Sequence, residues 1–291
     1  MRLALRAARE RTGLSQSEVA KKLGWSLSKL QRIELGEVTV SPTDLRAVLD
    51  IYQVTDMEQV AALVQHARTA RRERYWTRPE HRDNLPPGLL QLLQFELAAT
   101  AVREYQSTLV PGHLQTSAFA EATLAQHDLE LTAEEMRVRL EVRLARRRRM
   151  VEEDGAPDYL LLLDESALWR TVGDLETTAD QFEDLAEVAL RPSVQLRVLP
   201  MDAGALIGMF GVFSVIQLGP DDADAVLYRE SYDRDELIED QAAVLHHRNV
   251  FERFWRQALD VQASRALILA RLYDIRARIA RASGQDQDMP S

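Results

Sequence analysis

Cysteine is absent from this sequence of 291 residues. Its absence excludes disulfide bonds, zinc sites built on thiolates and a cysteine nucleophile, and it is typical of proteins from a reducing cytosol. Apolar runs are short, as in residues 160–163, and none approaches the length that spans a membrane. The N-terminal residues also lack the basic, apolar and small-residue order of a signal peptide. We therefore expect a soluble, cytoplasmic protein without a membrane partner.

Charges of opposite sign gather in two parts of the chain. The formal net charge is −10, which alone argues against nucleic-acid binding. Residues 1–82 nevertheless hold 15 Lys and Arg against 10 Asp and Glu, a net of +5, which leaves −15 for the remainder. This asymmetry indicates a small basic module, able to meet phosphates, joined to a larger acidic module that disfavours non-specific contact with DNA.

Two short helices joined by a tight turn are predicted near the N-terminus. Ser15 and Glu18 have the spacing of a capping box, which begins a helix, and Gly24 ends that helix. A second helix is predicted over about 26–35. This spacing is typical of the helix pair that reads DNA, in which the second helix enters the major groove. Apolar residues are predicted to lock the pair together on its inner face: Leu14, Val19, Ala20, Leu23, Leu30 and Ile33.

Polar side chains on the outer face of the second helix are the candidate DNA-binding residues. Arg32 can form a bidentate contact with a guanine edge or grip a phosphate, and Lys29 lies on the same face. Ser26 and Ser28 can bond base edges or phosphates. Gln16 begins the first helix, where its side chain and the helix N-terminus would meet the DNA backbone. An all-helical bundle without a DNA role is the alternative, because helical periodicity alone does not exclude it.

The ordered motif resembles the phage-repressor (Xre-type) helix-turn-helix family over about residues 1–70. The residues that carry the resemblance are 13–20 (GLSQSEVA), Gly24 and 28–36 (SKLQRIELG). The resemblance implies a five-helix domain with a buried ion pair between Arg9 and Glu34. Leu27 departs from the family's usual polar residue, so it either reads a thymine methyl group or relaxes the binding site.

The chain is predicted to be mainly α, with a smaller α/β part. Residues 75–88, which include three prolines, predict a linker between a DNA-binding domain over 1–74 and an α+β domain over 89–281. A disordered tail is predicted over 282–291. The second domain should hold about four strands flanked by helices. The predicted strands are 159–163, 194–199, 210–218 and 225–230, and the predicted helices are 89–106, 116–127, 132–152, 174–190 and 235–281.

A second ordered series resembles the C-terminal domain, of unknown function, in a large group of actinobacterial Xre-type regulators. The series includes 109–116 (LVPGHLQT), 163–168 (LDESAL) and 194–200 (VQLRVLP). The resemblance covers about 89–280 and brings no established ligand or chemistry. Members often lie beside genes for small partner proteins and affect development or antibiotic production. His113 replaces the usual hydrophobic residue of the first motif.

Two places in the larger domain are candidate sites for a ligand or partner. Pro111, His113 and Gln115 lie at a corner before a helix, where Gln115 could instead bond buried backbone. Asp164 and Glu165 follow a predicted strand. Carboxylates there can do acid–base work or hold a metal, but capping of the next helix is the favoured interpretation for Asp164.

Seven arginines crowd the helix predicted over 132–152. If exposed, they would extend a DNA footprint along phosphates, but a solvated face that pairs partly with acidic neighbours is favoured. They are Arg137, Arg139, Arg143, Arg146, Arg147, Arg148 and Arg149. No catalytic constellation, metal-binding pattern or phosphate-cradling loop stands out. The sequence therefore predicts neither an enzyme, nor a metal site, nor a cofactor.

Together these observations predict a sequence-specific transcriptional regulator that binds a palindromic operator of double-stranded DNA as a homodimer. The larger domain would dimerise and bind a signal molecule, a peptide or a small partner protein. One alternative is an antitoxin-like or scaffold protein that binds a small partner and uses DNA binding for autorepression. Another is an enzyme tethered to DNA, with Asp164, Glu165 and Glu230 as its carboxylates.

Overall fold

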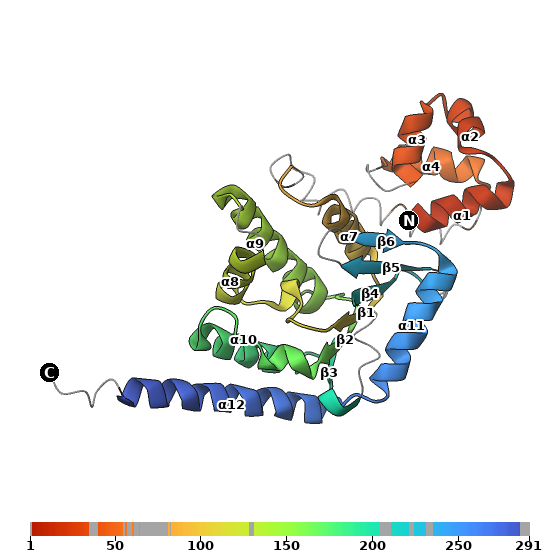
Figure 1. Cartoon of the computed structure of the whole chain (residues 1–291). Helices are drawn as coiled ribbons and strands as arrows, with labels where there is room; N and C mark the ends of the chain where they lie inside the picture. The colour runs from red at the N-terminus through yellow and green to blue at the C-terminus, as the bar shows by residue number, and fades with distance from the viewer. Residues whose placement is uncertain are drawn as a thin grey trace. The chain divides into compact units, whose positions relative to one another are not determined.

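A computed structural model describes residues 2–34, 40–54, 56, 60, 64, 81, 83–127, 131–203, 211–220, 224–230 and 235–285 (Figure 1). The chain forms two compact units, which divide between Arg82 and Asp83. The predicted fold class is confirmed, because the described chain is mainly helical and its second unit holds a mixed sheet. Of the helices described, none is both long enough and apolar enough to cross a membrane.

The first unit is helical where it is described, with α1 (Arg2–Thr12), α2 (Gln16–Leu23), α3 (Leu27–Glu34) and α4 (Pro42–Ile51). Serine hydroxyls begin two of these helices, Ser15 for α2 and Ser41 for α4, because each accepts a backbone amide of the first turn. The resemblance implies a fifth helix after these four, but most residues from 55 to 82 lie outside the described residues. Side chains from all four described helices share one core, which includes Leu5, Ala8, Val19, Ala20, Leu30, Ile33, Leu45, Val48, Leu49 and Tyr52.

The second unit is built around a mixed sheet with the strand order β3-β2-β1-β4-β5-β6. The first three strands run parallel, and helices carry the chain from each to the next, as parallel neighbours require. The other three strands are antiparallel and extend the sheet beyond β1. The strands are β1 (Ala101–Gln106), β2 (Asp158–Asp164), β3 (Val194–Leu199), β4 (Val212–Gln217), β5 (Ala225–Glu230) and β6 (Glu236–Ile238).

Helices cover both faces of this sheet (Figure 1). On one face, Tyr105, Leu162 and Phe213 pack with Phe251 and Phe254 of α11 in an apolar core. Figure 1 shows α9 and α10 on the side of the sheet opposite α11, and α12 packs along α10 and β3. The helices are α7 (Pro87–Ala98), α8 (Ser117–His127), α9 (Ala133–Arg147), α10 (Leu175–Val188), α11 (Gln241–Trp255) and α12 (Val261–Gln285), with short helical turns η2 (Gly112–Leu114), η3 (Arg148–Glu152), η4 (Glu165–Trp169) and η5 (Met201–Ala203).

Two strands contradict the sequence-based prediction, so the sheet has six strands rather than about four. The helix predicted over 89–106 ends at Ala98, and β1 follows in the middle of the sheet. The strand is not predicted because it carries charged residues that are typical of a surface helix. In the structure, Arg103 donates to Glu252 of α11 at 2.9 Å, and Glu104 is buried. The helix predicted from 235 is preceded by β6, which pairs with β5.

The C-terminal boundary also differs from the prediction. The single helix predicted over 235–281 is two helices, since α11 ends at Trp255 and α12 begins at Val261. The second helix continues to Gln285, so residues 282–285 of the predicted disordered tail are helical. Residues 286–291 lie outside the described residues.

Candidate nucleic-acid interface

The turn between α2 and α3 is fixed by local sequence. Ser15 N donates to Glu18 Oε2 at 2.8 Å, and Glu18 N donates to Ser15 Oγ at 3.3 Å, which completes a capping box. Hydrogen bonding to Ser15 lowers the pKa of the Glu18 carboxyl. At the other end of α2, Gly24 has a φ of 66°, a left-handed conformation in which a side chain is strained. This conformation fixes the direction in which the chain leaves α2 and enters α3.

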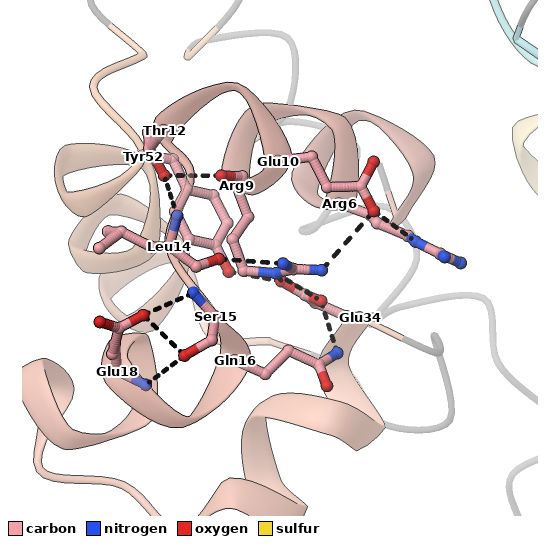
Figure 2. Close-up of polar contacts among 10 residues, drawn as sticks. All are labelled: Arg6, Arg9, Glu10, Thr12, Leu14, Ser15, Gln16, Glu18, Glu34 and Tyr52. Carbon is pink, nitrogen blue, oxygen red and sulfur yellow. Dashed lines mark hydrogen bonds and ion pairs between the residues drawn. The ribbon is translucent and has the colours of Figure 1, made fainter.

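Glu34, the last residue of α3, is a buried carboxylate with 2% of its side chain exposed, and it bonds to three other helices of the first unit (Figure 2). Arg9 of α1 donates through Nε to Oε1 at 2.9 Å and to Oε2 at 3.1 Å. Gln16 of α2 donates to Oε2 at 2.8 Å. Tyr52, which follows α4, donates its hydroxyl to Oε1 at 2.5 Å. The structure thus contains the Arg9–Glu34 pair that the resemblance implies, and it adds two donors.

The protonation states of this cluster favour an ionised carboxylate. Burial alone would raise the pKa of Glu34, but hydrogen bonds from Arg9, Tyr52 and Gln16 outweigh it and hold the pKa below its ordinary value. Burial and the bond to Glu34 raise the pKa of Tyr52, which stays a neutral donor. A shift of α3 would leave a buried charge unpaired, so this cluster holds α3 in one orientation.

We predict that Glu34→Gln destabilises the first unit by about 3 kcal/mol at neutral pH, because Arg9 would keep a buried charge and lose its partner. Since folding lowers the pKa of Glu34, its stabilising contribution is present above the ordinary pKa and is lost as the pH falls through the lowered value. Thermal unfolding followed by circular dichroism should therefore show the wild type and the variant converging in acid.

Asp50→Asn is the matched control for this prediction. Asp50 is an exposed acid on α4 outside the Glu34 cluster, so its loss should change stability by less than about 0.5 kcal/mol. If the unfolding free energy of the Glu34 variant falls in acid as steeply as that of the wild type, Glu34 is not the group whose protonation destabilises the wild type in acid.

One side of α3 is open to solvent, and four of the predicted DNA-binding residues lie there or at its start. Ser26, Ser28 and Arg32 are exposed, and Leu27 exposes 42% of its surface although it is apolar. Ser26 Oγ accepts Lys29 N at 3.2 Å, which leaves the hydroxyl hydrogen available for an outside acceptor. This side can therefore offer hydroxyl, guanidinium and apolar contacts to a ligand.

The other two predicted DNA-binding residues are held by side chains of the same unit. Gln16 is half-buried and donates to Glu34, as described above. Lys29 Nζ lies 3.2 Å from Asp44 Oδ2 and 3.7 Å from the centroid of the Trp25 ring. The structure thus leaves four of the six predicted residues at the surface of α3 and ties two into internal contacts.

The corner that contains Pro111, His113 and Gln115 is buried between β1 and α8. Gln115 Nε2 donates to the Val110 carbonyl at 2.9 Å, and Gln115 Oε1 accepts Arg143 Nη1 at 2.7 Å. Both ends of this amide are therefore used in packing the corner. His113 has 1% of its surface exposed, and burial followed by the charges of nearby arginines lowers its pKa well below the ordinary value, so its ring is neutral.

Asp164 and Glu165 bond to backbone amides. Asp164 Oδ1 accepts Ser166 N at 2.9 Å and caps η4, while Glu165 Oε2 accepts Met201 N at 3.0 Å. Glu230, the third carboxylate of the enzyme alternative, is the last residue of β5. Within the described parts of the chain, no three His, Cys, Asp or Glu side chains are grouped so that they could hold a metal ion. This arrangement suits helix capping and loop anchoring.

Arginines of α9 make ion pairs inside the second unit, as the favoured interpretation expects of part of this face, but their partners are not predicted from the sequence. Arg146 donates two hydrogen bonds to the buried carboxylate of Glu96, at 2.6 and 2.9 Å. Arg147 forms a similar pair with Asp184 at 2.8 Å. These partners lie 50 and 37 residues away in sequence, so no local spacing could reveal them. Arg146 and Arg147 are therefore committed to the fold.

Glu104 of β1 lies near the Arg146–Glu96 ion pair. Its role is not predicted from the sequence. Its Oε1 accepts Gln106 Nε2 at 2.8 Å, and its Oε2 accepts the Tyr159 hydroxyl at 2.8 Å. Burial raises the pKa of Glu104 to about 7, although these bonds and the charge of Arg146 oppose the rise. The only local sign of this buried carboxyl is an acidic residue in a segment that the sequence predicts as helix rather than strand.

We predict that the second unit becomes less stable between about pH 5 and pH 8 because of Glu104. Folding raises the pKa of this group above its ordinary value of 4.5, so the stability it contributes is fully present in acid and is lost as the pH rises through about 7. The loss should be on the order of 3 kcal/mol. Urea titrations read by hydrogen exchange in β1 and β2 measure it.

Glu104→Gln supplies the comparison, because glutamine cannot ionise, while its oxygen can still accept Gln106 Nε2 and its amide can donate to the Tyr159 hydroxyl oxygen. The variant should lose this component of the pH dependence and be more stable than the wild type at pH 8. Identical pH profiles for the two proteins would show that Glu104 is not buried as a titrating group.

Comparison with known proteins assigns both units to sequence families. Residues 1–63 match a helix-turn-helix domain, and residues 89–270 match a domain of unknown function, DUF5753. Neither the curated proteins nor the solved structures include a match to the chain. The helix-turn-helix match, together with the capped turn between α2 and α3, indicates that the first unit binds DNA.

Proposed function

The chain belongs to the family defined by the domain of unknown function DUF5753, and we propose that it is a sequence-specific transcriptional regulator of the Xre type. In this proposal α3 enters the major groove of double-stranded DNA. The observation that carries the proposal is the form of α3, which exposes polar and apolar side chains on one side while Glu34 locks the other.

The exposed side of α3 supplies the chemistry for reading base edges. Arg32 can donate two parallel hydrogen bonds to a guanine, and Ser28 can bond a base edge or a phosphate. Leu27 has no hydrogen-bonding group, so its exposed side chain is suited to the methyl group of thymine. The mixture of contacts favours sequence-specific reading over simple attraction to phosphates.

The second unit is proposed to pair two copies of the chain and to receive a signal molecule or a small partner protein. The recognition helix has eight residues, so one copy reads few base pairs, and two copies on a palindrome double the contacts. Residues 83–291 carry a net charge of −15, which suits contacts with protein rather than with DNA. The structural use of Asp164 and Glu165 supports a role without catalysis.

The test is selection from a library of random DNA duplexes, followed by gel-shift titration of the enriched sequence against random competitor. We expect a palindrome whose half-sites lie about one helical turn apart, because a two-fold dimer places two α3 helices on one face of DNA. A shift that random DNA displaces completely, or a library without enrichment, would contradict the proposal.

Arg32→Ala refines the same experiment. The variant should bind the selected duplex more weakly by about 1–3 kcal/mol, with its fold intact by circular dichroism, and should lose discrimination at one guanine. Arg11→Ala removes the same charge from an exposed position on α1 and serves as control. Equal affinities for the wild type and Arg32→Ala would remove Arg32 from the reading surface.

A further inference from the structure

Lys29 of α3 makes two contacts with side chains from outside its own helix. It lies in the first turn of α3, and its ammonium group is 3.2 Å from the carboxylate of Asp44 in the first turn of α4. The same group lies over the Trp25 ring, 3.7 Å from its centroid. The two charged side chains are only partly exposed, at 42% for Lys29 and 36% for Asp44.

The two partners hold the ammonium group from different elements. Asp44 is itself fixed, because its backbone amide donates to Ser41 Oγ at 3.0 Å and its carboxylate lies at the N-terminus of α4, where a negative charge is favoured. A partly exposed ion pair is weak by itself. The contact with the face of the Trp25 ring adds a second attraction for the same ammonium group. Together they favour a Lys29 that stays on the protein.

We propose that Asp44 holds Lys29 away from the phosphates and thereby limits the affinity of α3 for DNA of any sequence. The inference rests on the proposed function, and it assigns Asp44 a role that tunes binding. A phosphate contact by Lys29 would be available on every duplex, since phosphates carry no sequence information. Its removal leaves binding dependent on the base contacts of Leu27, Ser28 and Arg32.

The salt dependence of binding to a random-sequence duplex tests this arrangement. The logarithm of the binding constant falls with the logarithm of the salt concentration, with a slope of about −0.9 for each neutralised phosphate. We expect Asp44→Asn to steepen the slope by about 0.9 and to tighten binding roughly fivefold to tenfold at about 0.1 M salt. Lys29→Met should leave the slope of the wild type unchanged but return that of Asp44→Asn to the wild-type value.

Asp50→Asn is the matched control, because it removes an exposed acid from the same helix without touching Lys29. It should leave the slope unchanged. The inference is overturned if Lys29→Met alone reduces the slope by about 0.9, because Lys29 would then already lie on a phosphate. Unchanged binding by a folded Asp44→Asn protein overturns it as well. If the Asp44 variant does not fold, the slope measured for Lys29→Met still tests the inference without it.

The same titration separates the two proposals. If the wild-type chain binds neither the random duplex nor an enriched one at about 50 mM salt, where electrostatic binding is strong, the proposed function fails and this inference fails with it. If the wild type binds and the slopes follow a different pattern, only the assignment of Asp44 fails.

Discussion

The carboxylate of Glu34 is the constraint on which the proposed DNA-reading surface depends. A buried charge costs several kcal/mol unless donors replace its water, and here three side chains from three other parts of the unit do so. Each of these hydrogen bonds therefore ties α3 to another part of the unit. Rotation or translation of α3 would break more than one of these bonds at once, so its exposed side is presented in a single orientation.

Two of the predicted DNA-binding residues make internal contacts, and the first of them belongs to this cluster. Gln16 lies where α2 meets Glu34, and its amide completes the set of donors around the carboxylate. Lys29 lies on the side of α3 that faces Asp44, which neutralises it. The other predicted residues of α3, Leu27, Ser28 and Arg32, are exposed, and they offer directional hydrogen bonds and one apolar contact.

Local signals in the sequence predict α2, α3 and the turn between them. Caps such as Ser15 and Gly24 act within a few residues, so their spacing is visible without the fold. The Arg9–Glu34 pair spans 25 residues and was inferred only from resemblance. The contribution of Tyr52 was missed, because one tyrosine after a helix looks like any other core residue.

The second unit was harder to predict because its polar groups are satisfied over long distances in sequence. The strand β1 carries Arg103 and Glu104, which resemble surface residues until their partners on α11 and β2 are known. In the same way the arginines of α9 resemble a solvated stripe, while Arg146 bonds to a carboxylate on α7. Gln115 and Asp164 each bond to backbone, as the structural alternatives to a ligand site expect.

The most direct test of the central claim is the affinity of Glu34→Gln for a selected duplex, measured at a temperature where circular dichroism shows its helices intact. Glu34 is buried and cannot touch DNA, so the account predicts a large loss of specific affinity through misplacement of α3, with weaker effects on random DNA. If the folded variant binds the selected duplex as tightly as the wild type does, the orientation of α3 does not depend on Glu34 and the account is wrong.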